Sequence, residues 1–236
     1  MLTQLKKIQE WVLPHYCCLC GEEANNDRDI CHFCETSLPW AEDRCYRCGL
    51  AGVETKSSAL YCERCIENPP KFDRLCTVFS YEAPITKLVR GLKFGRQLCY
   101  GRILGEWLAD KVKDWYKNSS LPDAVIPVPL HKKRLKARGY NQSLECLWPV
   151  KRQYTIPILH DSCIRGRHTK PQSELKNKDQ RRANLNKAFN VVKPLHLEHV
   201  AIMDDVVTTG STVNNLSAAL KQAGVSLVDV WCIARD

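Results

Sequence analysis

Val200-Ala-Ile-Met-Asp-Asp-Val-Val-Thr-Thr-Gly-Ser-Thr212 is the most informative segment of this 236-residue sequence. Apolar residues lead to two adjacent acids, a turn of small hydroxyl residues and glycine follows, and helical periodicity begins at Ser211. A helix N-terminus carries unpaired N–H groups and the positive end of the helix dipole, so a phosphate binds there readily. The segment therefore predicts a buried strand, an anion-binding bend and a helix.

The two acids make this bend more specific than a general anion site. A carboxylate beside a phosphate repels it unless the carboxylate binds something else, and ribose hydroxyls are a suitable partner. Mg²⁺ could bridge the nearby oxygens. The alternative is a strand, turn and helix in which the Thr and Ser residues act only as caps. The candidate ribose and phosphate residues are Asp204, Asp205, Val206, Val207, Thr208, Thr209, Gly210, Ser211 and Thr212.

Apolar runs and helix-period stretches alternate on both sides of this segment. The expected strands are Leu75–Tyr81, Ala124–Pro129, Ile158–Arg165, Val200–Val207 and Leu227–Ala234. The expected helices are Pro84–Phe94, Leu98–Lys117, Tyr140–Arg152 and Ser211–Ala223. Such alternation predicts an α/β domain with a mostly parallel sheet flanked by helices, in which ligands bind outside the carboxyl ends of the strands.

Nine of the 14 cysteines lie between Cys17 and Cys65. We place a domain boundary after them, at Asn68-Pro69-Pro70, because two prolines stiffen the chain and remove backbone donors. Residues 1–68 would then form a small cysteine-rich module, and residues 69–236 the α/β domain. The other five cysteines occur singly in apolar runs, where we expect small buried side chains.

Four Cys-x-x-Cys pairs predict two structural zinc sites. The spacing lets two thiolates reach one tetrahedral Zn²⁺ at about 2.3 Å, and two pairs complete one closed site. Grouping neighbouring pairs is the simplest assignment, and a cross-braced pairing is the alternative. Cys18 falls outside the spacing. The expected ligands are Cys17, Cys20, Cys31 and Cys34 on one ion and Cys45, Cys48, Cys62 and Cys65 on the other.

Composition narrows the class of protein and its location. The sequence is 44% hydrophobic and 26% charged, which is typical of a folded chain and unlike a disordered one. No apolar segment approaches the ~20 residues that a membrane helix needs, and the N-terminus lacks the apolar core of a secretory signal. We therefore expect a cytoplasmic protein, with any association with the inner face of the membrane made through partners.

Positive charge is concentrated in two segments, within an excess of 35 Lys and Arg over 26 Asp and Glu. Residues 132–142 contain five cations and no acid, and a long basic stretch follows residue 165. These cations could neutralise a pyrophosphate or follow a nucleic-acid backbone, whereas a solvated basic helix is the alternative for the first segment. The candidate nucleic-acid or flexible-loop residues are Lys133, Arg134, Lys136, Arg138, Asn141, Gln142, Arg165, Arg167 and Lys170.

From about Phe72 onward the chain resembles the type I phosphoribosyltransferases, through the strand, acid pair and hydroxyl-rich loop at 200–212. The resemblance implies that Asp204 and Asp205 hold the ribose of a phosphoribosyl pyrophosphate, with Mg²⁺, and that residues 208–212 bind its 5′-phosphate. It also gives the pyrophosphate-loop position to Pro129, Leu130, His131 and Lys132. Many members have two glycines where this chain has Gly210-Ser211.

Nearly the whole chain resembles the ComF family, through the Cys-x-x-Cys module, Pro127-Val-Pro-Leu130, Arg138-Gly-Tyr-Asn-Gln142, Thr169-x-x-Gln172 and the 204–212 loop. The resemblance implies a role in natural transformation and DNA utilisation, acting on incoming single-stranded DNA in the cytosol with competence or recombination proteins as partners. The alternatives are an active phosphoribosyltransferase with an unknown base, and a regulatory sensor that uses the same pocket.

Overall fold

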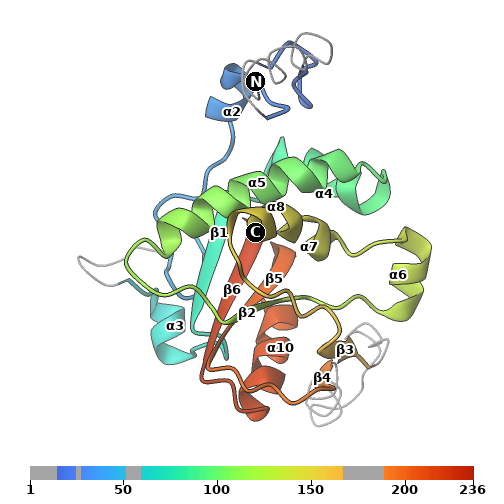
Figure 1. Cartoon of the computed structure of the whole chain (residues 1–236). Helices are drawn as coiled ribbons and strands as arrows, with labels where there is room; N and C mark the ends of the chain where they lie inside the picture. The colour runs from blue at the N-terminus through green and yellow to red at the C-terminus, as the bar shows by residue number, and fades with distance from the viewer. Residues whose placement is uncertain (1–14, 25–27, 52–59, 167–188) are drawn as a thin grey trace, which may run out of the picture.

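Four parallel strands form the central sheet, in the order β1-β6-β5-β2 (Figure 1). The computed structural model describes residues 15–24, 28–51, 60–166 and 189–236. All three strand pairings are parallel, so the carboxyl ends of the strands meet at one edge of the sheet. The strands are β1 (Arg74–Ser80), β2 (Ala124–Pro127), β5 (His199–Val207) and β6 (Leu227–Arg235).

Helices cover both faces of this sheet, as the sequence predicts (Figure 1). Alternate residues of β5 divide between two cores: Ala201 and Met203 pack in one with Trp107, and Ile202 packs in the other with Leu216. The first core lies under α4 (Ile85–Phe94), α5 (Leu98–Trp115), α7 (Gln142–Glu145) and α8 (Leu147–Gln153), and the second under α10 (Ser211–Gln222). The expected α/β class is therefore confirmed.

The strand expected at 158–165 is shorter than predicted and belongs to a different sheet. Ile158 makes only an isolated bridge to Val125, beside the edge strand β2. The end of the segment forms β3 (Cys163–Arg165), which pairs antiparallel with β4 (Phe189–Val191) in a separate two-stranded sheet. The apolar run at 158–165 could not reveal this, because a short run gives no partner or direction.

The expected helix Tyr140–Arg152 is divided in two. α7 ends at Glu145, Cys146 follows, and α8 begins at Leu147. Before them, Lys132–Arg138 forms the short helix α6, and Gly139 ends it with a φ of 88°. The segment is therefore a short basic helix, and the role of its cations stays a prediction.

The cysteine-rich part contacts the α/β core at several places. Near its start, Arg28 pairs with Asp110 and Arg102 with Asp29, while Trp107 donates to Glu35 over 2.9 Å. This part contains the short helices α2 (His32–Thr36) and α3 (Glu63–Glu67). The division of the chain at residues 68 and 69 stays a prediction.

Four of the five scattered cysteines are buried, as expected: Cys76, Cys146, Cys163 and Cys232. Cys99 is exposed near the start of α5, so its assignment to the interior was wrong. α5 begins at Leu98, which is also exposed, and its buried face starts at Gly101.

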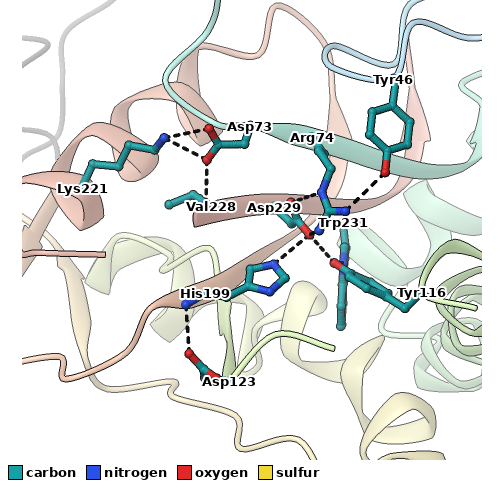
Figure 2. Close-up of polar contacts among 10 residues, drawn as sticks. All are labelled: Tyr46, Asp73, Arg74, Tyr116, Asp123, His199, Lys221, Val228, Asp229 and Trp231. Atoms are coloured by element: carbon teal, nitrogen blue, oxygen red, sulfur yellow. Dashed lines mark hydrogen bonds and ion pairs between the residues drawn. The ribbon is translucent and has the colours of Figure 1, made fainter. Parts of the chain in front are cut away.

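A buried polar cluster joins the strands at the edge opposite their carboxyl ends (Figure 2). The Asp229 carboxylate, 1% exposed, accepts hydrogen bonds from Arg74 and Tyr116 and lies 2.9 Å from His199 Nε2. Trp231 Nε1 donates to the Tyr116 hydroxyl over 3.0 Å. The cluster connects β1, β5, β6 and the residue that follows α5, so it holds the sheet together away from the ligand edge.

Candidate functional site

The bend between β5 and α10 has the features of an open anion site. Thr208, Thr209 and Ser211 are exposed, and Gly210 has a φ of 76°, which favours glycine. Among the described residues, the backbone amides of 208–210 have no hydrogen-bond partner. A hollow of about 30 Å³ lies within the bend. Unpaired amides and hydroxyls around a hollow at a helix N-terminus can donate to phosphate oxygens.

The two acids before the bend have different surroundings. Asp205 is 3% exposed, and its Oδ2 lies 2.9 Å from the Nζ of Lys93, at the end of α4. Asp204 is partly exposed, and its Oδ1 accepts from the Asp205 amide over 2.9 Å. Asp204 is therefore the acid more available to a ligand, while Asp205 is engaged by an internal cation.

The protonation of Asp204 is shifted by its position. Although part of the Asp204 side chain is exposed, the surrounding protein desolvates its carboxyl; this desolvation, and then the negative charge of Asp205, raise the pKa of the Asp204 carboxyl well above its usual value, against the opposing effect of Lys93. A ligand that brings hydroxyl donors or a divalent cation would favour the charged form of this carboxyl. The site thus holds an acid whose charge a sugar or metal ligand would stabilise.

A cavity of about 680 Å³ opens in front of the acids, within the size range of about 300–1,000 Å³ usual for ligand pockets. Its charged wall contains five cations and two acids, which favours a ligand with several negative charges. Val128, Leu130, Val206 and Thr212 complete the part nearest the sheet. The charged residues are Lys93, Arg96, Arg134, Arg138, Arg165, Asp204 and Asp205.

The residues predicted for a pyrophosphate loop follow β2 and lead into α6. Leu130 lines the cavity, and Pro129 is half-buried beside it. His131 caps α6 by accepting from the Lys133 amide over 3.2 Å, and Lys132 is exposed at the first position of that helix. Of these four residues only Leu130 is among the lining residues of the cavity, and the pyrophosphate-loop role of the segment stays a prediction.

The predicted basic residues divide between the cavity and the outer surface. Arg134, Arg138, Gln142 and Arg165 line the cavity. Lys133 and Lys136 are exposed on α6 and are not among its lining residues, and Asn141 donates to the Val128 carbonyl over 3.0 Å, which fixes the backbone. Arg167 and Lys170 lie outside the described residues.

Sequence reasoning missed the contribution of the end of α4. Lys93, Phe94 and Arg96 all line the cavity, and Arg96 has an unusual φ of 54°. A signal was present in the sequence. The amphipathic segment that buries Ile85 and Leu88 ends in Lys93-Phe-Gly-Arg96, whose side chains are not needed for packing of the core. Only the fold could show that this helix end faces the acids of β5.

The two predicted groups of cysteines are brought together by the structure. In each group, the four sulfur atoms lie within 4.8 Å of one another. Cys20 Sγ is 3.7 Å from Cys31 Sγ, and Cys48 Sγ is 3.7 Å from Cys62 Sγ. Four thiolates around a tetrahedral Zn²⁺ at about 2.3 Å would be about 3.8 Å apart, so both groups fit this ion. The neighbouring grouping is therefore correct, and Cys18 belongs to neither group.

Local hydrogen bonds favour a thiolate in each group. Burial opposes ionisation of Cys17, but backbone donors at Cys20, Cys31 and Leu19 outweigh it and lower the pKa to about 6. Cys45 is affected in the same way, and its pKa falls to about 7. Deprotonated thiols are the form that binds zinc. With four sulfurs on each ion, the sites have no open position, which suits a structural role.

Comparisons with known proteins agree with this architecture. A family model described as a double zinc ribbon domain matches residues 8–79. The chain is 35% identical to the DNA utilization protein YhgH of Escherichia coli O157:H7 over 226 residues, covering 94% of this chain and 98% of that protein. It is 36% identical to Competence protein F of Haemophilus influenzae over 193 residues, 80% and 84% of the two chains. Competence protein ComFC of Streptococcus pneumoniae is 21% identical over 236 residues, 93% and 99% of the two chains.

The described part of the chain contains no helix with both the length and the apolar character needed to cross a bilayer.

Proposed function

We propose that this chain, which belongs to the ComF family, acts in DNA utilisation by binding a sugar phosphate of single-stranded DNA in the cavity in front of Asp204. One observation carries the proposal: a bend with unpaired amides lies beside an acid and below a cationic wall. Together these groups offer donors for a phosphate, an acceptor for a sugar hydroxyl, which a DNA strand carries at its 3′ end, and positive charge for neighbouring phosphates.

The arrangement of cations around the cavity favours a polyanionic strand as the ligand over a neutral small molecule. Arg134 and Arg138 project from α6 on one side of the cavity, and Arg165 ends β3 on another. Burial, and then the charge of Arg134, lower the pKa of Arg165, so the guanidiniums of Arg134 and Arg165 repel each other until an anion binds. Successive phosphates of a strand would relieve that repulsion at more than one point.

The names of the relatives support the same biological setting. Proteins called DNA utilization protein and Competence protein F align with 80–94% of this chain. By the family relationship we assign the chain to natural transformation or DNA utilisation, with competence or recombination proteins as partners. Zinc would hold the N-terminal module in shape for such contacts.

The acid pair favours a second candidate, an active phosphoribosyltransferase. Asp204 beside an open phosphate bend is suited to phosphoribosyl pyrophosphate with Mg²⁺, and the cations of the cavity would neutralise the diphosphate. In that case the reaction would transfer phosphoribose to a base and release pyrophosphate.

Two measurements test these proposals. Fluorescence anisotropy with a labelled single-stranded oligonucleotide measures the association constant. Its logarithm should fall linearly with the logarithm of the salt concentration, with a slope of about −0.7 for each neutralised phosphate. Weak binding without salt dependence contradicts the cationic groove. Incubation with phosphoribosyl pyrophosphate, Mg²⁺ and a panel of bases then separates the candidates, because steady release of pyrophosphate with any base favours the transferase.

Asp204→Asn is the sharpest variant for the ribose. It removes an acceptor of strong hydrogen bonds while keeping the shape of the side chain, and it leaves the Asp205–Lys93 pair intact. Calorimetry with ribose 5-phosphate should show at least a tenfold loss of affinity. Unchanged affinity would remove Asp204 from the site.

A further inference from the structure

We infer that Phe94 is a stacking surface for a nucleobase at the mouth of the cavity, so that the ligand is a nucleotide unit of single-stranded DNA. This inference rests on the proposed function and adds a base to the sugar phosphate assigned there. Phe94 lines the same cavity as Asp204 and Thr212, on the side formed by the end of α4.

The exposure of Phe94 has no explanation in the packing of its helix. The ring is 75% exposed, whereas four other apolar residues of α4 are fully buried. Their positions, at intervals of three and four, define the face that packs on the sheet, and Phe94 lies off that face. Those buried residues are Ile85, Leu88, Val89 and Leu92. A large aromatic side chain that the core does not use is thus presented to the cavity.

Neighbouring contacts hold the end of α4 in place. Lys93, the preceding residue, has its Nζ 2.9 Å from the buried Asp205 Oδ2, which ties the end of α4 to β5. The guanidinium carbon of Arg138 lies 5.6 Å from the centroid of the Phe94 ring, and Arg138 also pairs with Gln142. An exposed ring at an anchored helix end, with one guanidinium beside it, is placed to stack on a planar ligand.

Different residues of the cavity would contact the base and the phosphates of a nucleotide. Arg96 and Arg134 carry charge at the same cavity and would attract phosphates whatever base is attached. A phenyl ring has no preference for phosphate, but every base has a π-face that stacks on it. Phe94 should therefore add affinity only where a base is present, and it should tolerate any base.

The test compares two strands of equal length and charge, oligo(dT) and an abasic deoxyribose-phosphate strand, by anisotropy on the full chain. The unaltered protein should bind oligo(dT) about tenfold more tightly than the abasic strand. Phe94→Ala should remove that preference and leave abasic binding unchanged, while Phe94→Trp should keep it. Phe33→Ala is the matched control, because Phe33 is 78% exposed on α2, away from the cavity lining.

The outcomes distinguish this inference from the proposed function. Equal affinity of the unaltered protein for both strands overturns the stacking role of Phe94 while leaving phosphate binding intact. A loss of affinity for both strands in Phe94→Ala, with circular dichroism unchanged, also overturns it, because the ring would then act on the backbone site. If neither strand binds the unaltered protein, both the proposed function and the inference fail.

A further arm identifies the source of the base. Thymidine 5′-monophosphate should compete with oligo(dT) only at a concentration at least a hundredfold higher, since it lacks the neighbouring phosphates that the arginines attract. Competition at equal concentration would overturn the assignment to a strand and indicate a free nucleotide.

Discussion

Arg235 Nε donates a hydrogen bond of 2.9 Å to the carbonyl oxygen of Cys48, a predicted ligand of the second zinc site. The same guanidinium donates from Nη1 to the carbonyl of Val207 over 2.9 Å and to that of Thr208. Arg235 is only 6% exposed. One buried side chain thus links the second cysteine group to the strand end where the phosphate bend begins.

This link predicts that the two zinc sites differ in their effect on ligand binding. Cys65→Ser should remove the second ion, loosen the Cys48 carbonyl from Arg235 and lower the affinity for ribose 5-phosphate several-fold. Cys34→Ser, in the first group, should remove one ion and leave that affinity close to normal. Calorimetry measures the affinity, and equal losses in both variants would contradict the link.

The zinc content itself is a separate prediction. Elemental analysis of the unaltered protein should give two zinc ions per chain, since two Cys₄ groups are present. Each of the two variants above should retain about one. A content below one ion in the unaltered protein would contradict the assignment of both groups.

A glycine pair tests whether the bend binds phosphate. Gly210 and Gly224 both have positive φ, 76° and 98°, and a Cβ on either would meet no atom within 4 Å. Alanine at either position should therefore destabilise the fold by a similar amount, about 1 kcal/mol. Only Gly210→Ala should weaken phosphate binding, because its Cβ would enter the space beside the open amides. Denaturation curves and calorimetry separate the two effects, and equal binding by both variants would contradict a phosphate at this bend.

The raised pKa of Asp204 predicts a stability gain from removing its charge. Its folded-state pKa lies above the unfolded value of about 3.9, so the free energy of unfolding falls as pH rises from about 4 through the folded pKa. Asp204→Asn should be more stable than the unaltered protein at pH 7, with the difference shrinking toward pH 4. Urea unfolding at several pH values measures this. A less stable variant at pH 7 would mean that the charged carboxylate stabilises the fold.

The sequence predicted the strand–bend–helix segment well because its signals are local. The apolar run to Asp204, the glycine at 210 and the periodicity after Ser211 each fix their own backbone, and β5 and α10 fall within one residue of the expected bounds. The cysteine groups were equally predictable, since two-residue spacing sets the geometry of a ligand pair.

What the sequence could not show depends on contacts between distant segments. Lys93 is 112 positions from Asp205, and neither residue type signals the other. The end of the segment at 158–165 pairs with β4 and not with the main sheet. β4 is only three residues long, which is too short a run to be recognised in the sequence. The missed half of the site, at the end of α4, required the order of strands and helices in space.

The Asp229 cluster gives the strongest prediction for stability. Burial alone would raise the pKa of this carboxyl, but hydrogen bonds from His199, Arg74 and Tyr116 outweigh it and hold the pKa below its usual value (Figure 2). Asp229→Asn leaves the Arg74 guanidinium, 17% exposed, without its carboxylate, and should cost about 3–5 kcal/mol at pH 7.

A surface pair provides the control for Asp229→Asn. Asp161 pairs with Lys193, and both side chains are 56% exposed, so Asp161→Asn should change stability by less than about 1 kcal/mol. The folded-state pKa of Asp229 is depressed. The contribution of its carboxylate to the free energy of unfolding is therefore fully present above about pH 3.9 and is lost as pH falls through the folded-state pKa. The difference between Asp229→Asn and the unaltered protein should therefore narrow in strong acid. Urea unfolding at pH 7 and in acid measures it, and equal costs for the two variants at pH 7 would show that the buried carboxylate contributes no more than a surface one.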